Sequence, residues 1–488
     1  MPIDTKYFKD LELEILNLFD NLDQSLDGWL IKSENWQALN TIFPKFKEKI
    51  QTIYIDPPFN KEQEADYFYS VKFKDATWIT MLENRLRLAR DLLKDTGSIF
   101  VRCDYNGNMY VRLLMNEIFG EENFRNEIIV KRGAPKAGLF LQFETLKSIG
   151  VMYDNLYWFS KNVEKVYGKF IQKLSEARRG YWTSFKKIYD RPTMRYEILG
   201  INLTEGQWMW NKERAYKAVE NYQKYLEIAK KAGETLEEYW ERTGRKLDFI
   251  RRQGDTIQYW VPPKEEALLD NNWLDIPGYS SRWNFKTENS EILLKRVIES
   301  TSNEGDLVLD FFLGSGTTTA VAHKLGRKWI GVEMGEHFYS VVLPRMKKVL
   351  AYDKSGISKE KDVKEKYNQQ KAGGFFKYYE LEQYEDTLRK TKYEDSDLFE
   401  IPSQSPYSQY IFMKDKKMLD ALELDFKNNK VKVNLEKLYP NIDIAETLSN
   451  LLGKWIKRIS ENEVEFEDGE KVEIKNLDYR LIKPLIWW

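Results

Sequence analysis

The sequence predicts an α/β fold, because three short apolar runs that read as strands each end in an acidic residue. The runs are residues 50–55, 306–310 and 328–332. They end at Asp56, Asp310 and Glu333, and a helix is expected over residues 317–325, between the second and third runs. Strands that alternate with helices are typical of α/β sheets, whose ligands bind just beyond the carboxyl ends of the strands. We therefore expect these three carboxylates near one ligand site.

The first run is followed by Asp56-Pro57-Pro58-Phe59, in which the prolines end the strand because they lack an N–H and restrict φ. The exocyclic amine of adenine is a poor nucleophile, since its lone pair is delocalised into the ring. A carboxylate on Asp56 and a proline carbonyl could each accept one amine N–H, and Phe59 could stack on the base for about 1–3 kcal/mol. The tetrapeptide thus suits methylation of a base amine, although Asp and Pro are also common turn residues.

The second motif combines the turn Gly314-Ser315-Gly316 with the start of a helix, whose unpaired N–H groups suit a carboxylate. Glu333 follows about 20 residues later, where an acidic residue can bond ribose hydroxyls. A dinucleotide fingerprint would have a third Gly or Ala where Thr319 stands, and Asp310 would lie badly beside a pyrophosphate. Asp310 suits a methionine ammonium group, so the pattern favours S-adenosylmethionine over a nicotinamide dinucleotide.

The two motifs together carry a family resemblance. Asp56-Pro57-Pro58-Phe59 far ahead of Asp310-Phe311-Phe312-Leu313-Gly314-Ser315-Gly316 resembles the β-group amino-methyltransferases of DNA, in which the amine motif precedes the cofactor motif. The surrounding sequence is similar, more specifically, to the modification (Mod) subunits of type III restriction-modification systems. The matching stretches are residues 53–60, 78–104, 117–124, 310–334 and 481–488.

The resemblance implies a permuted, Rossmann-like S-adenosylmethionine-dependent methyltransferase core with an inserted recognition region and a C-terminal α+β domain. The expected divisions are a core over residues 1–160 and 271–350, a target-recognition region over 161–270, and a C-terminal domain over 351–488 for DNA clamping, self-association or partner docking. In the family an Asp-Pro-Pro-aromatic motif usually accompanies N6-adenine and a Ser-Pro-Pro motif N4-cytosine. The implied activity is therefore site-specific methylation of adenine N6 in double-stranded DNA.

The resemblance also implies the roles of individual residues. The catalytic set is Asp56, Pro57, Pro58 and Phe59. The cofactor-binding set is Asp310, Phe312, Gly314, Ser315, Gly316, Thr317, Glu333 and Asn289. Asn289 belongs to a second cofactor segment, residues 287–290, which alternatively caps a helix over residues 291–300. No metal site is expected.

Several alternatives remain open at this point. N4-cytosine methylation, methylation of RNA or of a protein glutamine, and a non-catalytic DNA-binding or assembly subunit are the competing functions. Family members more often carry Tyr where Phe59 stands, and they tend to be longer. The chain could thus be a full type III subunit, one part of a split subunit, or a solitary methyltransferase. The implied partners are DNA, a second copy of the chain and a restriction (Res) subunit.

Composition sets outer bounds on these functions. A length of 488 residues suggests two to four domains, and a net charge of −1 restricts nucleic-acid contact to local patches. The single cysteine, Cys103, points to a reducing compartment, and two histidines, His323 and His337, provide no zinc cluster. There is no signal-peptide pattern and no run of 18 apolar residues, so we expect a cytoplasmic protein without a membrane span.

Residues 161–270 mix lysine and arginine with aromatic residues, which suits phosphate contacts and base stacking. A solvated helical surface is the competing interpretation, because residues 212–246 also hold many glutamates. Elsewhere we expect a helix over residues 5–20, a polar linker with helical pieces over 353–374, and a β-hairpin turning at Asp468-Gly469.

Overall fold

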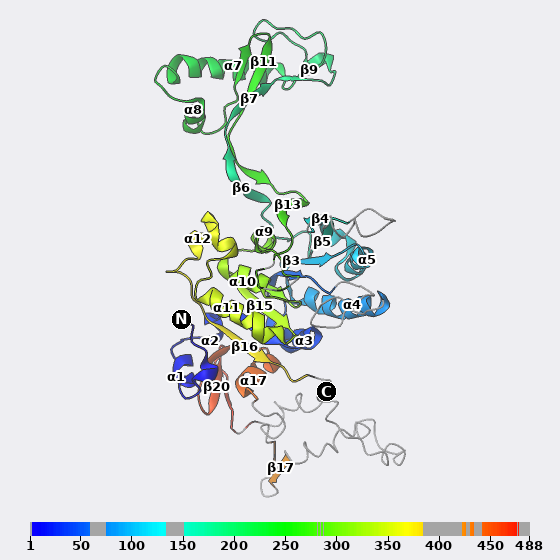
Figure 1. Ribbon diagram of the computed structural model, residues 1–488, viewed down its shortest axis with the longest axis vertical. Coiled ribbons are helices and arrows are strands. Elements are labelled where there is room, and N and C mark those ends of the chain that lie inside the picture. The colour runs from blue at the N-terminus through cyan, green and yellow to red at the C-terminus, as the bar shows by residue number, and fades with distance from the viewer. Residues whose placement is uncertain are drawn as a thin grey trace, which may run out of the picture. The chain divides into compact units, whose positions relative to one another are not determined.

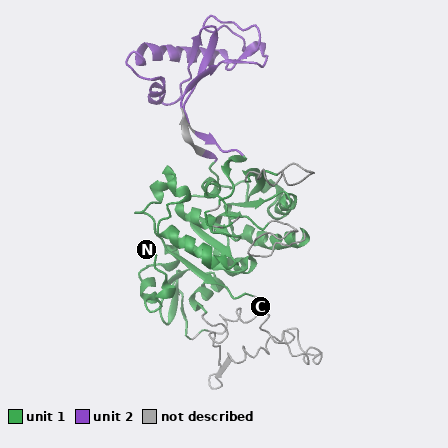
Figure 2. Ribbon diagram, viewed as in Figure 1, with its two compact units in different colours: residues 1–169, 271–488 green, residues 170–270 purple. Residues whose placement is uncertain are grey.

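The structure is a computed structural model in which the described residues are 2–58, 75–132, 151–280, 282–283, 285, 287–383, 422–425, 430–433, 442–475 and 477. Phe59 and residues 481–488 lie outside the described residues. The chain forms two compact units, residues 1–169 with 271–488 and residues 170–270, coloured separately in Figure 2.

A nine-stranded mixed sheet forms the centre of the larger unit (Figure 1). In spatial order its strands are β13 (Asn272–Pro277), β4 (Phe124–Lys131), β5 (Tyr153–Ser160), β3 (Leu93–Cys103), β2 (Ile50–Ile55), β14 (Leu307–Asp310), β15 (Lys328–Glu333), β1 (Gly28–Lys32) and β16 (Phe376–Glu380). Only β5 runs antiparallel to its neighbours; the other pairs in this sheet are parallel. This arrangement confirms the α/β class.

Helices cover both faces of the sheet (Figure 1). Those of one face are α3 (Asn35–Phe46), α4 (Asp75–Leu92) and α5 (Asn108–Phe119), and those of the other are α9 (Glu291–Thr301), α10 (Thr317–Lys324) and α11 (Leu343–Leu350). The first three helices bury apolar residues in one core with alternate strand residues such as Ile53, Ile55 and Leu309. Alternate strand residues face the same side because the side-chain period of a strand is two.

The order of the strands creates a switch point between β2 and β14. From β2 the chain crosses through α4 to β3, whereas from β14 it crosses through α10 to β15 on the other side. The two strands are parallel neighbours, with Ile53 opposite Leu309. Crossovers that diverge in this way leave a crevice at the carboxyl ends of the strands, where α/β sheets bind ligands. Asp56 and Asp310 therefore come to the same place.

Sequence periodicity predicted several elements correctly. The strand over residues 50–55 is β2, and the helix expected at 317–325 is α10. The hairpin consists of β20 (Glu463–Phe466) and β21 (Lys471–Glu473), with Val464 opposite Val472.

The single helix expected over residues 5–20 is wrong. The segment contains a 3-10 turn, η1 (Thr5–Tyr7), and one short helix, α1 (Glu12–Leu16). Phe8, Leu11 and Leu18 would share one stripe of a straight helix, but all three are exposed, so no core favours a single helix here. In the bent segment Leu16 and Phe19 pack on the C-terminal core while Leu18 stays 80% exposed.

The linker expected over residues 353–374 is packed against the core instead. It contains η6 (Gly356–Lys359) and α12 (Lys361–Lys366), whose Ile357 and Val363 are buried. Asp353 is buried as well, because its carboxylate pairs at 2.9 Å with the buried ammonium of Lys324 at the end of α10. A buried ammonium needs such partners, and they anchor the segment to the core.

The larger unit contains further short elements besides the central sheet and its helices. They are α2 (Leu22–Ser25), η2 (Glu121–Asn123), η5 (Phe338–Val342), α17 (Ile444–Leu452), β17 (Leu422–Asp425), β18 (Lys430–Val433) and β19 (Ile456–Ile459). Of these, β19 joins β20 and β21 in a three-stranded sheet. No helix among the described residues has both the length and the apolar character needed to cross a membrane.

The smaller unit has an apolar core of its own, formed around Phe185, Trp208 and Ile257. Its strands are β6 (Ile171–Arg178), β7 (Tyr181–Ser184), β8 (Lys186–Lys187), β9 (Gln207–Trp208), β10 (Ile250–Gln253), β11 (Thr256–Val261) and β12 (Lys264–Leu268). Its helical elements are η3 (Pro192–Met194), α7 (Lys212–Lys224), η4 (Tyr225–Ala229) and α8 (Leu236–Arg242). A separate core is consistent with a unit that folds around its own aromatic residues.

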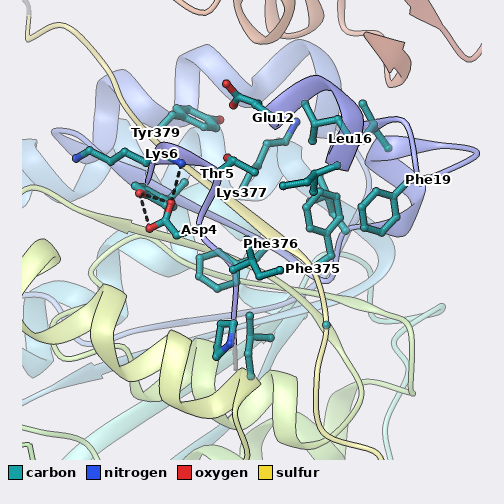
Figure 3. A pocket seen from close by; sticks show the side chains of 18 of the residues that line it. Asp4, Thr5, Lys6, Glu12, Leu16, Phe19, Phe375, Phe376, Lys377 and Tyr379 are labelled. Atoms are coloured by element: carbon teal, nitrogen blue, oxygen red, sulfur yellow. Dashed lines mark hydrogen bonds between the residues drawn. The ribbon is translucent and has the colours of Figure 1, made fainter. Parts of the chain in front are cut away.

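A cavity of about 710 Å³ in the larger unit lies between the N-terminal segment and β16, and Figure 3 shows residues from both. Its walls are largely apolar, with Leu16, Phe19 and Phe375 among them. The carboxylate of Asp4 there is already engaged, by the ammonium of Lys347 at 2.5 Å and by the hydroxyl of Tyr378 at 3.0 Å. The residues that line this cavity belong to neither sequence motif.

A buried ion pair should make a large contribution to stability where α3 meets the C-terminal segment. The Lys45 ammonium lies 2.7 Å from Asp23, and both side chains are fully buried. We expect Lys45→Met to lower the free energy of unfolding by about 3 kcal/mol, because Asp23 keeps only part of its compensation. Urea unfolding followed by tryptophan fluorescence measures this.

The matched control is Lys165→Met, because Lys165 pairs with Asp95 at 2.7 Å but both side chains are about half exposed. That substitution should change stability by less than about 1 kcal/mol. Equal urea midpoints for the two variants would contradict the assigned importance of the buried pair.

Candidate active site

A cavity of about 370 Å³ opens at the switch point and brings the two sequence motifs together. The predicted site residues that line it are Asp56, Pro58, Asn289, Phe312, Gly314, Ser315, Thr317 and Glu333. Asp310 and Gly316 belong to the same turn but do not line the cavity, and Phe59 lies outside the described residues. The volume falls at the lower end of the range for small-molecule sites.

Asp56 directly follows β2 and lines the cavity, and its Oδ2 accepts a hydrogen bond of 3.0 Å from Nδ2 of Asn289. Burial within the protein raises the pKa of Asp56 to about 6, although the charge of Arg102 and the bond from Asn289 act to lower it. A carboxylate with such a pKa is ionised at neutral pH and still able to take a proton.

The two prolines of the amine motif are not equivalent. Pro57 is buried, whereas the carbonyl of Pro58 accepts a hydrogen bond of 2.8 Å from the indole Nε1 of Trp78 on α4. This bond occupies one lone pair of the Pro58 carbonyl and fixes the end of β2 on α4. A carbonyl oxygen has a second lone pair, and Pro58 lines the cavity whereas Pro57 does not.

The glycine turn requires its glycines. Gly314 and Gly316 have φ values of +56° and +82°, a left-handed conformation that other residues adopt only at a cost. The N–H of Gly314 donates to Oε2 of Glu333 at 2.8 Å, which ties the turn to the end of β15. Glu333 also accepts from the N–H of Gly335 at 2.9 Å. The turn and the acidic residue predicted to bind the ribose thus form one hydrogen-bonded unit.

Asp310 holds the turn in place through two hydrogen bonds. Its Oδ1 accepts from the N–H of Phe312 at 3.0 Å and its Oδ2 from the hydroxyl of Thr318 at 2.5 Å. Burial raises the pKa of Asp310 to about 7, while these two hydrogen bonds act to lower it. When it is ionised, the carboxylate places negative charge next to the glycine turn, which would suit a cationic ligand.

Arg345 of α11 supports the start of α10, and local sequence patterns did not predict it. Its buried guanidinium donates to the carbonyl of Ser315 at 3.2 Å, to the hydroxyl of Thr317 at 3.0 Å and to the carboxylate of Glu291 at 3.1 Å. These bonds hold the first helical turn in place, so the backbone N–H groups at the amino terminus of α10 are preorganised for an anion.

Sequence reasoning also missed the contribution of the segment after β1. Ser33, Glu34 and Asn35 line the cavity together with Arg85 of α4. Nε of Arg85 donates to Oδ1 of Asn35 at 2.5 Å, and Nδ2 of Asn35 donates to the carbonyl of Phe311 at 3.0 Å. A sequence pattern could have predicted this segment, because residues 28–32 form an apolar run whose carboxyl end meets the same edge of the sheet.

Asn289 does not cap α9. Ser290 is the N-cap residue, and its side chain makes no capping bond. The amide of Asn289 instead faces the cavity and bonds to Asp56, as described above. Among the described residues no group of three or more His, Cys, Asp or Glu side chains could hold a metal ion.

Known proteins share much of this sequence. Residues 50–343 match the family described as DNA methylase. The chain is 29% identical over 435 residues to a probable type III restriction-modification enzyme HindVI Mod subunit of Haemophilus influenzae, a match that covers 76% of this chain and 56% of that protein. It is 26% identical to the type II methyltransferase M.EcaI of Enterobacter cloacae, over 63% of this chain and 67% of that one.

Two further proteins are similar to the chain. The StyLTI Mod subunit of Salmonella typhimurium is 26% identical, over 59% of this chain and 48% of that subunit. A structure of a putative DNA modification methylase of Thermus thermophilus, complexed with S-adenosyl-L-methionine, aligns with 72% of this chain and 98% of its own at a TM-score of 0.36 and 14% identity. The chain spans about half of the length of the Mod subunits that it matches.

The buried carboxylate of Asp310 should lower stability at neutral pH. A carboxyl whose folded pKa lies above its unfolded value contributes stability below the unfolded pKa that is lost as the pH rises through the folded pKa, here about 7. We expect Asp310→Asn to raise the free energy of unfolding by roughly 3 kcal/mol at pH 8 and to have little effect below pH 4. Thermal unfolding across this range measures the difference.

Asp95→Asn serves as the control, since Lys165 lowers the pKa of this exposed carboxyl and its loss should bring no gain at any pH. A gain for Asp310→Asn that was the same at pH 4 and pH 8 would show that ionisation of this carboxyl is not its cause.

Proposed function

This chain belongs to the DNA methylase family, and we propose that it transfers a methyl group from S-adenosylmethionine to the N6 amine of adenine in double-stranded DNA. S-adenosylmethionine is the methyl donor of the family. The observation that carries the proposal is the position of Asp56 and the glycine turn in one cavity at the switch point of the sheet. A donor site and an amine-binding carboxylate in one cavity suit direct transfer between two bound molecules.

The residues around the cavity fit the cofactor group by group. The N–H groups at the start of α10 would receive the methionine carboxylate, and Glu333, which lines the cavity, would accept from the ribose hydroxyls. Asp310 would supply negative charge for the methionine ammonium group. Bound there, the cofactor supplies a methyl group activated by its positively charged sulfur.

Asp56 would accept one N–H of the adenine amine and the carbonyl of Pro57 or Pro58 the other, which would draw the nitrogen toward tetrahedral geometry. The amine must lose a proton as it gains the methyl group, and Asp56, with a pKa of about 6, is suited to accept it. The target base would be flipped from the duplex, because its amine is unreachable inside the stack. Stacking of the base on Phe59 stays a prediction.

Adenine is preferred to cytosine because the first residue of the amine motif is Asp rather than Ser, the pattern that resembles N6-adenine enzymes. N4-cytosine methylation is the second candidate, and the family description does not distinguish the two.

The smaller unit is the proposed target-recognition region. Residues 170–270 hold 19 lysines and arginines against 16 acidic residues, a modest positive balance in a chain with net charge −1. Several of its helical arginines are paired within the unit, as in Arg214–Asp248 and Arg242–Glu234. The loop after β8 is better suited to DNA, since Ile188 and Tyr189 are 97% and 78% exposed directly beside two lysines.

A restriction-modification system is the proposed setting, because two relatives are Mod subunits of type III enzymes. A restriction subunit and a second copy of the chain would then be partners, with residues 351–488 serving DNA clamping, self-association or docking. The proposed location is the cytoplasm, where such systems meet DNA.

Long-read sequencing of DNA from a methylation-free host that expresses this chain tests the function. N6-methyladenine at every copy of one short motif is the expected result. N4-methylcytosine instead would establish the second candidate. Unmodified DNA from a host that contains the folded protein would overturn the assignment as an independent methyltransferase.

Asp56→Ala should abolish transfer while cofactor binding stays within about threefold of the parent. Removal of a general base and amine acceptor typically costs about 100- to 10,000-fold in rate. Single-turnover transfer of labelled methyl to DNA measures the rate, and calorimetry measures cofactor binding.

The matched control is Cys103→Ala, on the strand next to β2, because direct transfer needs no thiol and Cys103 is fully buried. This variant should retain transfer within a few-fold. Substantial transfer by Asp56→Ala would refute the catalytic role of the carboxylate.

A further inference from the structure

The amide of Asn289 is held from both sides in a buried hydrogen-bond chain that ends at Asp56. Its Oδ1 accepts from a guanidinium N–H of Arg102 at 2.5 Å and from the hydroxyl of Tyr54 at 2.9 Å. Its Nδ2 donates to Oδ2 of Asp56 at 3.0 Å. Because a guanidinium can only donate, a flipped amide would set its NH2 group against Arg102 and its oxygen against the carboxylate. The orientation of the amide is therefore determined by its partners.

Arg102 is itself rigidly placed. It is fully buried on β3, where one terminal nitrogen donates to Asp154 of β5 at 2.8 Å and the other to the carbonyl of Gly278 at 2.9 Å. The ring of Tyr279 lies over the guanidinium with 4.0 Å from its centre to Cζ, and the Tyr279 hydroxyl donates to the same Asp154 oxygen at 2.9 Å. A buried guanidinium with this many partners has little freedom to turn away from Asn289.

We propose that Arg102 and Asn289 are positioning residues for the catalytic carboxylate: Arg102 orients the Asn289 amide, and the amide binds Oδ2 of Asp56 so that Oδ1 is presented to the substrate amine. The proposal rests on the proposed function for the role of Asp56. It assigns the Asn289 side chain to the carboxylate, whereas the sequence resemblance placed it with the cofactor.

The charges around Asp56 explain why its carboxylate needs the hydrogen bond from Asn289 and the positive charge of Arg102. The charged groups near Asp56 and its partners are Arg102, Arg132, Asp104, Asp154, Asp310 and Glu333, and the neutral titratable neighbours are Tyr54, Cys103 and Tyr279. Burial raises the pKa of Asp56, as do the charges of Asp154 and Asp104, and Arg102 and Asn289 oppose them. Without this compensation the carboxyl would hold its proton at neutral pH and could not accept from an amine.

The first test is the titration of Asp56 in the full-length, cofactor-free protein by infrared difference spectroscopy, with Asp56→Asn to assign the carboxyl band. Asn289→Ala removes the bond to the ionised form, so the titration midpoint should move up by about one pH unit. Tyr54→Phe keeps the ring and removes one donor to the amide, and it should shift the midpoint in the same direction by less.

The second test separates positioning from cofactor binding. Asn289→Ala should slow single-turnover transfer at saturating cofactor by about 10- to 100-fold, the effect of losing one hydrogen bond to a charged group. The cofactor dissociation constant should stay within about threefold. The acid limb of the rate profile should move to higher pH together with the infrared midpoint.

Arg102→Gln removes the guanidinium that orients the amide and opposes the raised pKa of Asp56, so it should also move the midpoint up. Arg327→Gln is its control for the loss of a buried guanidinium. Arg327 is 5% exposed and donates to the carbonyls of Ser302 and Leu325, before β15 and outside the cavity, so its loss should leave the Asp56 midpoint unchanged. An unmoved midpoint in both Asn289→Ala and Tyr54→Phe would overturn the inference. So would cofactor binding weakened tenfold or more with an unchanged rate at saturation. If the parent protein transfers no methyl group to DNA, the proposed function fails, and the infrared titration still decides the positioning roles.

Discussion

The parallel pairing of β2 with β14 is the constraint on which the rest of the structure depends. The register that sets Ile53 opposite Leu309 brings the ends of two strands from distant parts of the chain to one edge. After β2 the chain continues to one side of this pair and after β14 to the other side, so the two loops diverge and leave a cavity. The amine motif and the glycine turn meet only because these two strands are neighbours.

Burial of charged groups determines the electrostatics of the site. Burial raises the pKa of both Asp56 and Asp310, and the charge of Asp56 raises the pKa of Asp310 further. Arg102 on one side and Arg345 on the other supply buried positive charge. A site that holds buried and only partly compensated negative charge before its ligands arrive is destabilising for the fold but favourable for a cationic ligand and for proton transfer. The same carboxylates thus connect stability, pH and the proposed chemistry.

The described elements after residue 350 complete the larger unit. β16 pairs with β1 at the edge of the central sheet, and Lys377 on that strand bonds to the buried carboxylate of Asp23 at 2.8 Å. Asp23 also pairs with Lys45 of α3. Three parts of the chain thereby meet around one buried carboxylate, which explains why the C-terminal elements do not separate as a compact unit of their own.

The sequence by itself determined the strands that carry chemistry, since β-branched runs, prolines and glycines act locally. Residues 50–55, the turn at Gly314 and Gly316 and the hairpin near Asp468 were all predictable for this reason. The tertiary structure alone decided which side chains surround Asp56. Arg102, Arg345 and the segment at Ser33 approach the cavity through strand order and helix packing, which no local pattern encodes. The partner of Asn289 is the sharpest case, because its type suited a cap or a ligand contact equally, and only the positions of Arg102 and Tyr54 direct its amide to Asp56.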